Sequence, residues 1–478
     1  MSGLRERLLR HKSSGSQTKP AAALDTSVQT SEWSVIDAHM EHNEWGSFVM
    51  RRRYYDQQAK HGHYALSELL GQSDKLLHLL GAEAVTPEEQ DGLTHEKLLY
   101  LDTETTGLGI GTGNVAFMIG IGFYEKDQFV VEQMFIRDPG EELGMLHHLH
   151  EKIAEHPYLV TYNGKTFDWP IIKNRYILNR MQLDTQIAGH FDFLYPSRSL
   201  WKHTLPSCRL GKVEEEQLGV VRKDDVAGAL APVLYFQYLA ERKVSIVEGV
   251  FIHNELDILS LAGLSIHFAR ILSGKSNFKD MGLEELYRLG VWLDKLNQQW
   301  MSEQALECLA KRITGADSEE EEQGADDYLL PLAQVYKQQH RYTAARDLWE
   351  LYVERRKERT TASLDAYVEL SMHYEHREKQ YGLALSYAEQ ALDKAWRQHS
   401  LKRSYGGGGV RSTGKRQSSK SLEHVQESGI ADLEKRIQRL RQKSARANNQ
   451  LTKDKKRTVT RSQVGSESDL VLTMDNLI

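Results

Sequence analysis

The sequence has few cysteines and no long apolar runs. Only Cys208 and Cys308 occur among its 478 residues, which excludes a disulfide framework and fits a reducing compartment. No run of about 18 apolar residues is present, so the sequence predicts no membrane-spanning helix. The opening stretch MSGLRERLLRHKSSG is basic and amphipathic and lacks the apolar core of a secretory signal. These absences predict a soluble, cytoplasmic protein that does not contact membranes.

The chain also lacks a strong overall charge, since its formal net charge is −6. The charge is unevenly distributed, because residues 401–461 contain 17 Lys and Arg against five Asp and Glu, a net charge of +12, and the remainder carries −18. A basic tail on an acidic body indicates a polyanionic partner such as nucleic acid. A solvated, disordered extension explains the same composition equally well.

A chain of 478 residues is too long for one hydrophobic core, so we expect several domains. Within the basic tail, GGGG is expected to act as a hinge and IADLEKRIQRLRQK to form one exposed helix. The predicted segments are a flexible leader (1–32), a preface that includes a hairpin (33–95), an α/β domain (96–275), helical repeats (280–398) and a disordered basic tail (399–478).

The α/β domain is predicted from the order of its apolar segments. KLLYLD, NVAFMIGIGFYE and QFVVEQMFIRD predict three strands, and the short links between them favour antiparallel neighbours. PGEELGMLHHLHEKIAEH then predicts a helix, YLVTYN a fourth strand, and residues 168–180 a second helix. Three hairpin-like strands followed by strand–helix alternation are typical of a ribonuclease H-like mixed sheet flanked by helices.

The region after Leu283 has an all-helical pattern with internal similarity. LAQVYKQQHRYTAARDLWELYVERR and ELSMHYEHREKQYGLALSYAEQALDKA place small residues at matching positions, and LYRLGVWLDKLNQQWMSEQALECL is a degenerate earlier copy. Small residues let paired helices approach closely, as in tetratricopeptide repeats. The step of 38 residues departs from the usual 34, so an ordinary helical bundle stays open as an alternative. Such a region is a candidate surface for a protein partner.

The stretch YLDTETTGLG places two carboxylates at the end of a predicted buried strand. Side chains at i and i+2 share a face of a strand, so Asp102 and Glu104 point the same way. Two carboxylates that close repel each other unless a cation lies between them, and Mg²⁺ prefers such oxygen ligands. Alone, this short pattern is more often a strand end with ordinary solvated acids.

Two further segments supply partners for these carboxylates. In LVTYNGKTFDWPII, Asp168 stands where a helix begins, either as a site residue or merely as a helix cap. In FIHNELDILSLAGL, His253 and Asp257 stand four apart and share one helix face, either as site residues or as a local surface pair. Together these acids can hold two Mg²⁺ ions about 4 Å apart, the arrangement used for phosphoryl displacement. A neutral His253 can accept a proton from water.

The three segments resemble the motifs of the DEDD 3′–5′ exonucleases, a branch of the ribonuclease H-like superfamily. DTETTG resembles their first motif, YNGKTFD their second and HNELD their third. Residues 98–272 are most similar to the YprB-like ribonuclease H-like domain, and PSRSLWKHTLPSCRLGKVEEEQLG and DDVAGALAPVLYF resemble linking segments of that family. The tetratricopeptide-like region resembles the same family.

The resemblance implies a metal-dependent 3′–5′ exonuclease that hydrolyses DNA or RNA with two Mg²⁺ or Mn²⁺ ions. It assigns the general-base role to His253 and metal-ligand roles to Asp102, Glu104, Asp168 and Asp257. His253 stands four residues before Asp257, the spacing of the tyrosine subclass, whereas the histidine subclass usually has five; one residue rotates a helical side chain by about 100°. The alternative is a nucleic-acid-binding or scaffold protein that acts through its repeats and tail without turnover.

Other polar residues are candidates for contacting nucleic acid. Asn163 and Lys165 follow the fourth strand and are expected to reach a phosphate, and Arg198, Trp201 and Lys202 form a basic, aromatic cluster that would stack a base. A loop packed onto the domain by Trp201 is the simpler alternative. Asp192 is either another site carboxylate or a turn acid. GLGIGTG lacks the Lys-Ser/Thr ending of a phosphate loop, so we expect it to be a connection beside the site.

Overall fold

The computed structural model describes residues 32–56, 58–80, 92–107, 109, 111, 113–183, 187–223, 225–315, 324–405, 429–447 and 449. The chain divides into two compact units, at residues 1–277 and 278–478, and each is described by itself. The leader predicted at 1–32 therefore lies outside the described residues except for Glu32, and so does GGGG at 406–409. Within the described part of the chain, the helices are all too short or too polar to cross a membrane.

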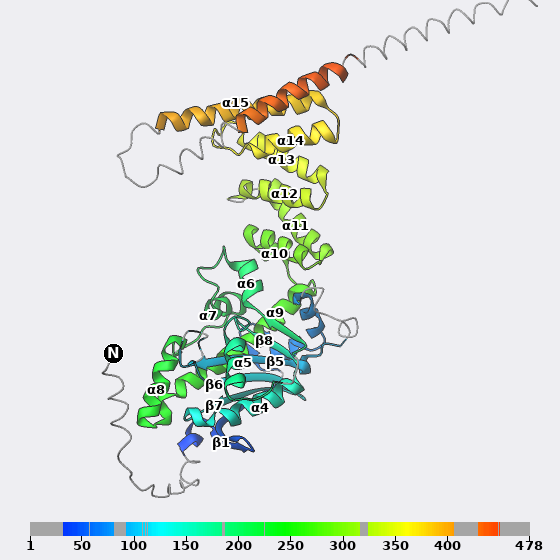
Figure 1. Cartoon of the computed structure of the whole chain (residues 1–478). Helices are drawn as coiled ribbons and strands as arrows, with labels where there is room; N and C mark the ends of the chain where they lie inside the picture. The colour runs from blue at the N-terminus through cyan, green and yellow to red at the C-terminus, as the bar shows by residue number, and fades with distance from the viewer. Residues whose placement is uncertain are drawn as a thin grey trace, which may run out of the picture. The chain divides into compact units, whose positions relative to one another are not determined.

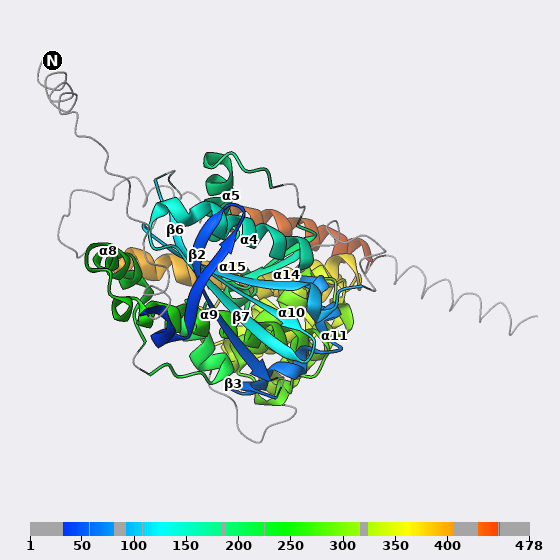
Figure 2. The same cartoon turned by 90° about the horizontal axis from the view of Figure 1, so that it is seen from below.

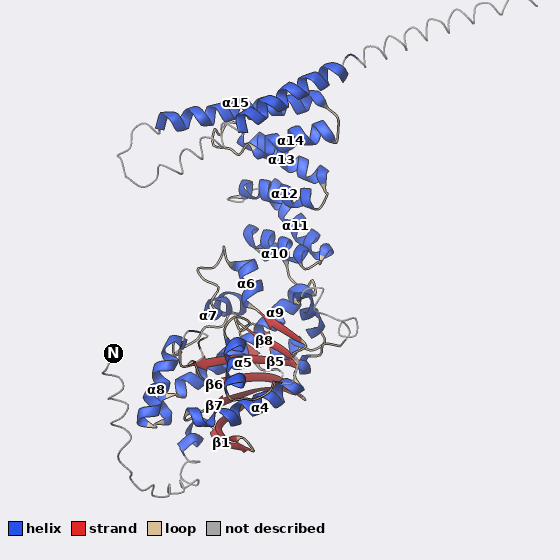
Figure 3. Cartoon of the chain, viewed as in Figure 1, coloured by secondary structure: helices blue, strands red, loops and turns tan. Residues whose placement is uncertain are grey.

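The mixed sheet predicted for the first unit is confirmed (Figures 1 and 3). It has seven strands. The strand order is β1-β2-β7-β6-β5-β8-β9, with antiparallel pairing from β1 to β5 and parallel pairing from β5 to β9. The strands are β1 (Ala38–Asn43), β2 (Gly46–Asp56), β5 (Leu98–Thr105), β6 (Ala116–Glu125), β7 (Gln128–Phe135), β8 (Tyr158–Thr161) and β9 (Gly189–Asp192), with a separate small hairpin of β3 (Lys60–His61) and β4 (Tyr64–Ala65).

The segment predicted as a preface contributes to this sheet. β1 and β2 form a hairpin, and β2 pairs along its length with β7, so the long blue strand β2 extends the sheet (Figure 2). Trp33, just before the hairpin, is 3% exposed and packs against Phe135 and Tyr238. Residues 33–56 are therefore part of the same hydrophobic core as the strands that follow them.

Helices cover both faces of the sheet. They are α4 (Glu142–Glu155), α5 (Asp168–Leu178), α6 (Leu194–Trp201), α7 (Leu210–Val213), α8 (Ala231–Glu241) and α9 (Glu248–Leu272). On β7, Glu132 contacts His148 of α4, whereas Gln133 donates to Asn254 of α9. Because successive residues of a strand point to opposite faces, α4 and α9 lie on opposite sides of the sheet. The strands between them are buried on both faces, which explains their continuous apolar runs.

The second unit consists of helical hairpins. Its helices are α10 (Leu283–Lys295), α11 (Gln299–Thr314), α12 (Leu329–Gln338), α13 (Tyr342–Arg356), α14 (Asp365–His376) and α15 (Tyr381–Tyr405), and they pair as α10 with α11, α12 with α13, and α14 with α15. Ala333, Ala345, Ser371 and Ala384 are fully buried, and the Ser371 hydroxyl donates to the Ala384 carbonyl at 2.9 Å. The small residues thus stand where paired helices touch, as the internal similarity predicts.

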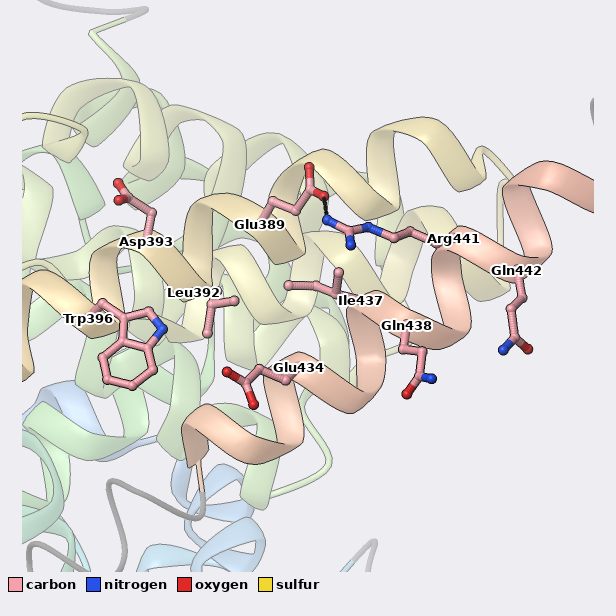
Figure 4. Close-up of a pocket in the computed structure, with 9 residues that line it drawn as sticks. All are labelled: Glu389, Leu392, Asp393, Trp396, Glu434, Ile437, Gln438, Arg441 and Gln442. Carbon is pink, nitrogen blue, oxygen red and sulfur yellow. Dashed lines mark hydrogen bonds and ion pairs between the residues drawn. The ribbon is translucent and has the colours of Figure 1, made fainter.

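The tail contains a helix that packs instead of lying exposed. Residues 429–447 are helical, and Ile430, Leu433, Ile437 and Leu440 are buried in the core of the second unit. These four side chains form a stripe with helical spacing, so the segment buries one face. Beside it, α15 and this helix border a groove that contains an ion pair between Arg441 and Glu389 (Figure 4). The prediction of an exposed helix in a disordered tail is wrong for these residues.

Candidate active site

The two carboxylates that end β5 face α9. Asn254, whose side chain is fully buried, donates from Nδ2 to Asp102 Oδ2 at 2.9 Å and accepts from Gln133 at 2.9 Å. Glu104 follows on the same face of the strand and is 8% exposed. Gly120 on the neighbouring strand leaves room for Asn254, because a Cβ at this position would lie 2.0 Å from its Oδ1. The hydrogen bond from Asn254, which is 152 residues away in the sequence, therefore fixes the orientation of Asp102.

Asp168 reaches the same strand end from the other face of the sheet. It is the first residue of α5, and it accepts a hydrogen bond from the hydroxyl of Thr103. Thr103 lies between the two acids of β5 and so points to the opposite face. Burial raises the pKa of Asp168 to about 6, although the hydrogen bond from Thr103 opposes that effect. Asp168 thus begins α5 and also contacts β5 through Thr103.

On α9, His253 and Asp257 lie side by side one turn apart. His253 Nε2 is 3.5 Å from Asp257 Oδ2. His253 Nδ1 is 2.8 Å from Asp225 Oδ2, which can only accept, and 3.3 Å from Nη1 of Arg222, which can only donate. The shorter contact, to Asp225, favours a hydrogen on Nδ1. That contact leaves Nε2 as the nitrogen that can accept a proton in the neutral ring. The tyrosine-like spacing of four residues is therefore the spacing that brings His253 to Asp257.

The carboxylates are close enough to affect one another's charge. Burial, followed by the charges of Asp257 and Asp168, raises the pKa of Asp102 well above its ordinary range. Burial, followed by Asp102 and Asp257, does the same for Glu104. A group of buried acids that repel each other in this way favours either protons or a cation. The four acids selected from the sequence thus influence one another electrostatically, and His253 contacts one of them, Asp257.

One cation already lies among these acids. The side chain of Arg222, 11% exposed, donates to Asp257 and to Glu214, with a further contact of 3.1 Å to Asp225. Glu214 is 1% exposed and also accepts from Ser260. Burial opposes the charge of Arg222, but Glu214 and Asp257 outweigh it and raise its pKa. The guanidinium therefore supplies the positive charge next to Asp257.

The donor set fits a hard divalent cation, although its present arrangement does not form a ready cage. Carboxylate oxygens are the ligands that Mg²⁺ and Mn²⁺ prefer. Across the described ranges, no three His, Cys, Asp or Glu side chains converge closely enough to hold one metal ion. Oδ1 of Asp257 is engaged by Arg222, and Oδ2 faces His253. Asp102, Glu104, Asp168 and Asp257 would have to draw together around an ion.

Two comparisons relate this chain to known proteins. Residues 99–269 match the RNase_H superfamily, a span that contains all four acids and His253. The chain is also 34% identical over 404 residues to a Bacillus subtilis (strain 168) protein, "Uncharacterized protein YprB", covering 79% of this chain and 92% of that protein. The chain belongs to the YprB family. Its first unit is an RNase H-like domain, which indicates a nuclease-like protein with nucleic acid as its substrate.

Three residues of this YprB-family site escaped prediction. Arg222 and Asp225 stand in a polar stretch without periodicity, and nothing local distinguishes them from solvated charges. Asn254 lies inside the third motif, between His253 and Asp257. Asn254 is buried in α9. The signal in the sequence is an amide at a helix position where an apolar residue is expected, because a buried amide needs polar partners. Their roles depend on partners that are distant in the sequence: Asp225 contacts His253, 28 residues away, and Arg222 contacts Asp257, 35 residues away.

The residues predicted to contact nucleic acid divide into two groups. Trp201 is 1% exposed at the end of α6 and packs against His267 and Phe268, so the prediction that it stacks a base is wrong. Its large apolar ring instead anchors α6 to α9. Arg198 and Lys202 are exposed on the same helical segment, and their binding role stays a prediction.

Asp192 closes the turn that leads to Asp168. Its carboxylate accepts from the backbone N–H of Asn163 at 2.7 Å and of Lys165 at 3.0 Å. Asn163 has a φ of 68° and needs such support, because few residues adopt this conformation. Asp192 is therefore the turn acid of the two alternatives, while the side chain of Lys165 is exposed beside the site.

Proposed function

We propose that this chain is a metal-dependent 3′–5′ exonuclease that hydrolyses phosphodiester bonds of DNA or RNA. The observation that supports this most is the crowding of buried carboxylates at the end of β5, where burial and mutual repulsion raise the pKa values of Asp102 and Glu104. A fold does not keep such a cluster for stability, because like charges destabilise it. Clusters of this kind are typical of metal-assisted phosphoryl transfer.

Asp102, Glu104, Asp168 and Asp257 would hold two Mg²⁺ or Mn²⁺ ions. When bound, these ions would stabilise charge on the attacking and leaving oxygens of the phosphodiester. Asn254 has a distinct task, since its Nδ2 donates to one oxygen of Asp102 and makes no such bond to the other. Thr103 does the same for Asp168. Supporting hydrogen bonds of this type fix the direction of ligand oxygens.

His253 would accept the proton of the attacking water at Nε2. The hydrogen bond from Nδ1 to Asp225 would select the tautomer in which Nε2 carries no hydrogen. It would also stabilise the positive charge that the ring gains. Its position beside Asp257 places the ring at the carboxylate cluster. Asp225 is therefore a positioning residue for His253.

The substrate would approach over exposed cations near the site. Lys165 precedes Asp168 by three residues and is exposed, as are Arg198 and Lys202 on α6. Exposed cations of this kind bind phosphates without reading sequence. Asn163, which shapes the turn, would set the position of Lys165.

The decisive experiment uses the full chain with single-stranded DNA and RNA labelled at the 3′ or the 5′ end, in Mg²⁺, Mn²⁺ or EDTA. The proposal expects stepwise loss of nucleotides from the 3′ end in either metal and none in EDTA. Glu142→Gln is a matched control, because Glu142 is a buried carboxylate outside the cluster, paired with Arg175. Full activity in EDTA, or in Asp102→Asn, would overturn the two-metal mechanism.

The ion pair between Arg222 and Asp257 favours a second candidate. A chain whose Asp257 stays paired would bind nucleic acid and bring a partner through its repeats, without hydrolysing the strand. The same assay separates the two, because the second candidate retains the labelled strand intact in all three solutions while still shifting its electrophoretic mobility.

A further inference from the structure

Arg222 holds Asp257 in a way that competes with a divalent cation. Its guanidinium bridges three carboxylates: Nη2 donates to both Asp257 and Glu214, Nε donates to Glu214, and Nη1 lies 3.1 Å from Asp225. Side-chain exposure is 11% for Arg222, 14% for Asp257 and 1% for Glu214, so water screens this bridge weakly. The bridge is thus a strong contact within the metal-free site.

The bridge also supplies part of the charge that a metal ion would supply. The positive charge of Arg222 lowers the pKa of Asp102, against the larger effects of burial and of Asp257 and Asp168. A single guanidinium leaves most of the cluster's negative charge unbalanced. A divalent cation would balance it better, but it would meet like charge from Arg222 at Asp257. The two cations therefore exclude one another at this carboxylate.

Glu214 would keep the guanidinium of Arg222 paired after the contact with Asp257 is broken. The carboxylate of Glu214 is fixed by Ser260 on α9 and receives two of the guanidinium hydrogen bonds. Breaking the contact with Asp257 would leave that pair intact, so the side chain need not become unpaired in the interior. Rotation of one side chain is enough to free an oxygen of Asp257.

We propose that Arg222 is an internal counter-cation that a divalent metal ion must displace from Asp257, and that this exchange sets the metal affinity of the site. The inference rests on the proposed function, since it takes Asp257 as a metal ligand. A site whose competent state is only partly populated binds with an apparent affinity reduced by that fraction. Removing Arg222 would therefore tighten metal binding while destabilising the metal-free protein.

The test measures Mn²⁺ binding to the full chain by calorimetry and by the electron paramagnetic resonance of free Mn²⁺, after treatment with a chelator. Arg222→Gln is expected to lower the apparent Kd for Mn²⁺ by about 10- to 100-fold, within the usual range of coupling between linked sites. Its melting temperature without metal should fall, and the rise on adding Mn²⁺ should exceed that of the unsubstituted chain.

Arg175→Gln is the matched control, because Arg175 makes a similarly buried ion pair with Glu142 away from the cluster. It should lower the melting temperature and leave the Kd for Mn²⁺ within about twofold, as expected for independent sites. Should Arg222→Gln fail to fold because Glu214 is left buried, Arg222→Gln combined with Glu214→Gln removes both charges, and Arg222→Lys provides an intermediate case. Both variants should bind Mn²⁺ more tightly than the unsubstituted chain.

The outcomes separate this inference from the proposed function. Equal or weaker Mn²⁺ binding by the Arg222 variants, with binding that still requires Asp102, would overturn the exchange and leave the metal site standing. No Asp102-dependent Mn²⁺ binding in any variant would overturn both. Binding that is seen only once Arg222 is replaced supports the exchange in its strongest form.

Discussion

Each unit of this protein contains a crowded group of charges, and the two groups are built in opposite ways. In the first unit, Asp102 and its neighbouring acids share one guanidinium, that of Arg222. In the second unit, Glu375 has a fully buried side chain and accepts hydrogen bonds from three cations of the 429–447 helix, Arg436, Arg439 and Lys443.

The difference appears in the pKa values. Burial opposes the charge of Glu375, but hydrogen bonds from Arg439 and Lys443 outweigh it and lower its pKa to about 2. At Asp102, burial and like charges act together, and the pKa rises. A carboxylate with surplus positive charge is a completed structural contact. A carboxylate group with surplus negative charge is incomplete by itself and is suited to binding a cation.

The largest effect is expected from the incomplete cluster. Asp102→Asn should lower nuclease activity by more than the 10- to 100-fold that supporting residues cost, because the proposed function makes Asp102 a direct metal ligand. The metal-free variant should be at least as stable as the unsubstituted chain, since a repelling charge has gone. A nuclease assay checks the first part, and the midpoint of urea unfolding in EDTA checks the second. A variant that is inactive because it is unfolded would contradict the second.

The next effect concerns His253. Replacement by Ala should reduce the rate by about 10²- to 10⁴-fold, the usual contribution of a general base, while Mn²⁺ binding survives. His253→Tyr tests the spacing, because four residues before the last aspartate is the spacing that resembles the tyrosine subclass of the DEDD exonucleases. If Tyr restores activity that Ala loses, the position orients water. If Ala costs less than a few-fold, His253 has no part in proton transfer.

The cluster around Glu375 should contribute a smaller effect, and only to the stability of the second unit. Glu375→Gln is expected to destabilise docking of the 429–447 helix by about 2 to 3 kcal/mol, because hydrogen bonds to a charged group are lost. Hydrogen exchange of the backbone amides in that helix measures this loss of stability. Glu389→Gln is the control, since its pair with Arg441 is half-exposed and should be worth less than about 1 kcal/mol. Equal effects would remove the distinction between the two pairs.

The smallest effects are expected from pH, and they have opposite signs in the two units. The lowered pKa of Glu375 stabilises its helix above its ordinary value of 4.5, and this contribution disappears as pH falls toward about 2. The raised pKa of Asp168 stabilises the metal-free first unit below 3.8, and this contribution disappears as pH rises through about 6. Hydrogen exchange in chelator, corrected for intrinsic rates, should show protection of α5 and of the 429–447 helix changing in opposite directions.

Much of the first unit could be predicted because its signals are local. The strand β5 is a continuous apolar run, and the alternation of side chains places Asp102 and Glu104 together without knowledge of the fold. Helical spacing pairs His253 with Asp257 in the same way. Arg222 and Asp225 could not be found, because their partners are set by tertiary packing. Trp201 shows that a local signal can also mislead. An aromatic residue among cations is consistent with both a base-stacking surface and a buried anchor.

The alternation along β5 has a consequence for how the gene tolerates change. Asp102 and Thr103 serve opposite faces of one strand, the first held by α9 and the second by α5. Single substitutions upstream, at Leu99 for example, leave that assignment intact. Loss or gain of one codon within the strand would turn both acids toward α5 and the threonine toward α9, since a slip of one residue exchanges the two faces. The register of this strand, more than the identity of its apolar residues, therefore sets which side chains reach the site.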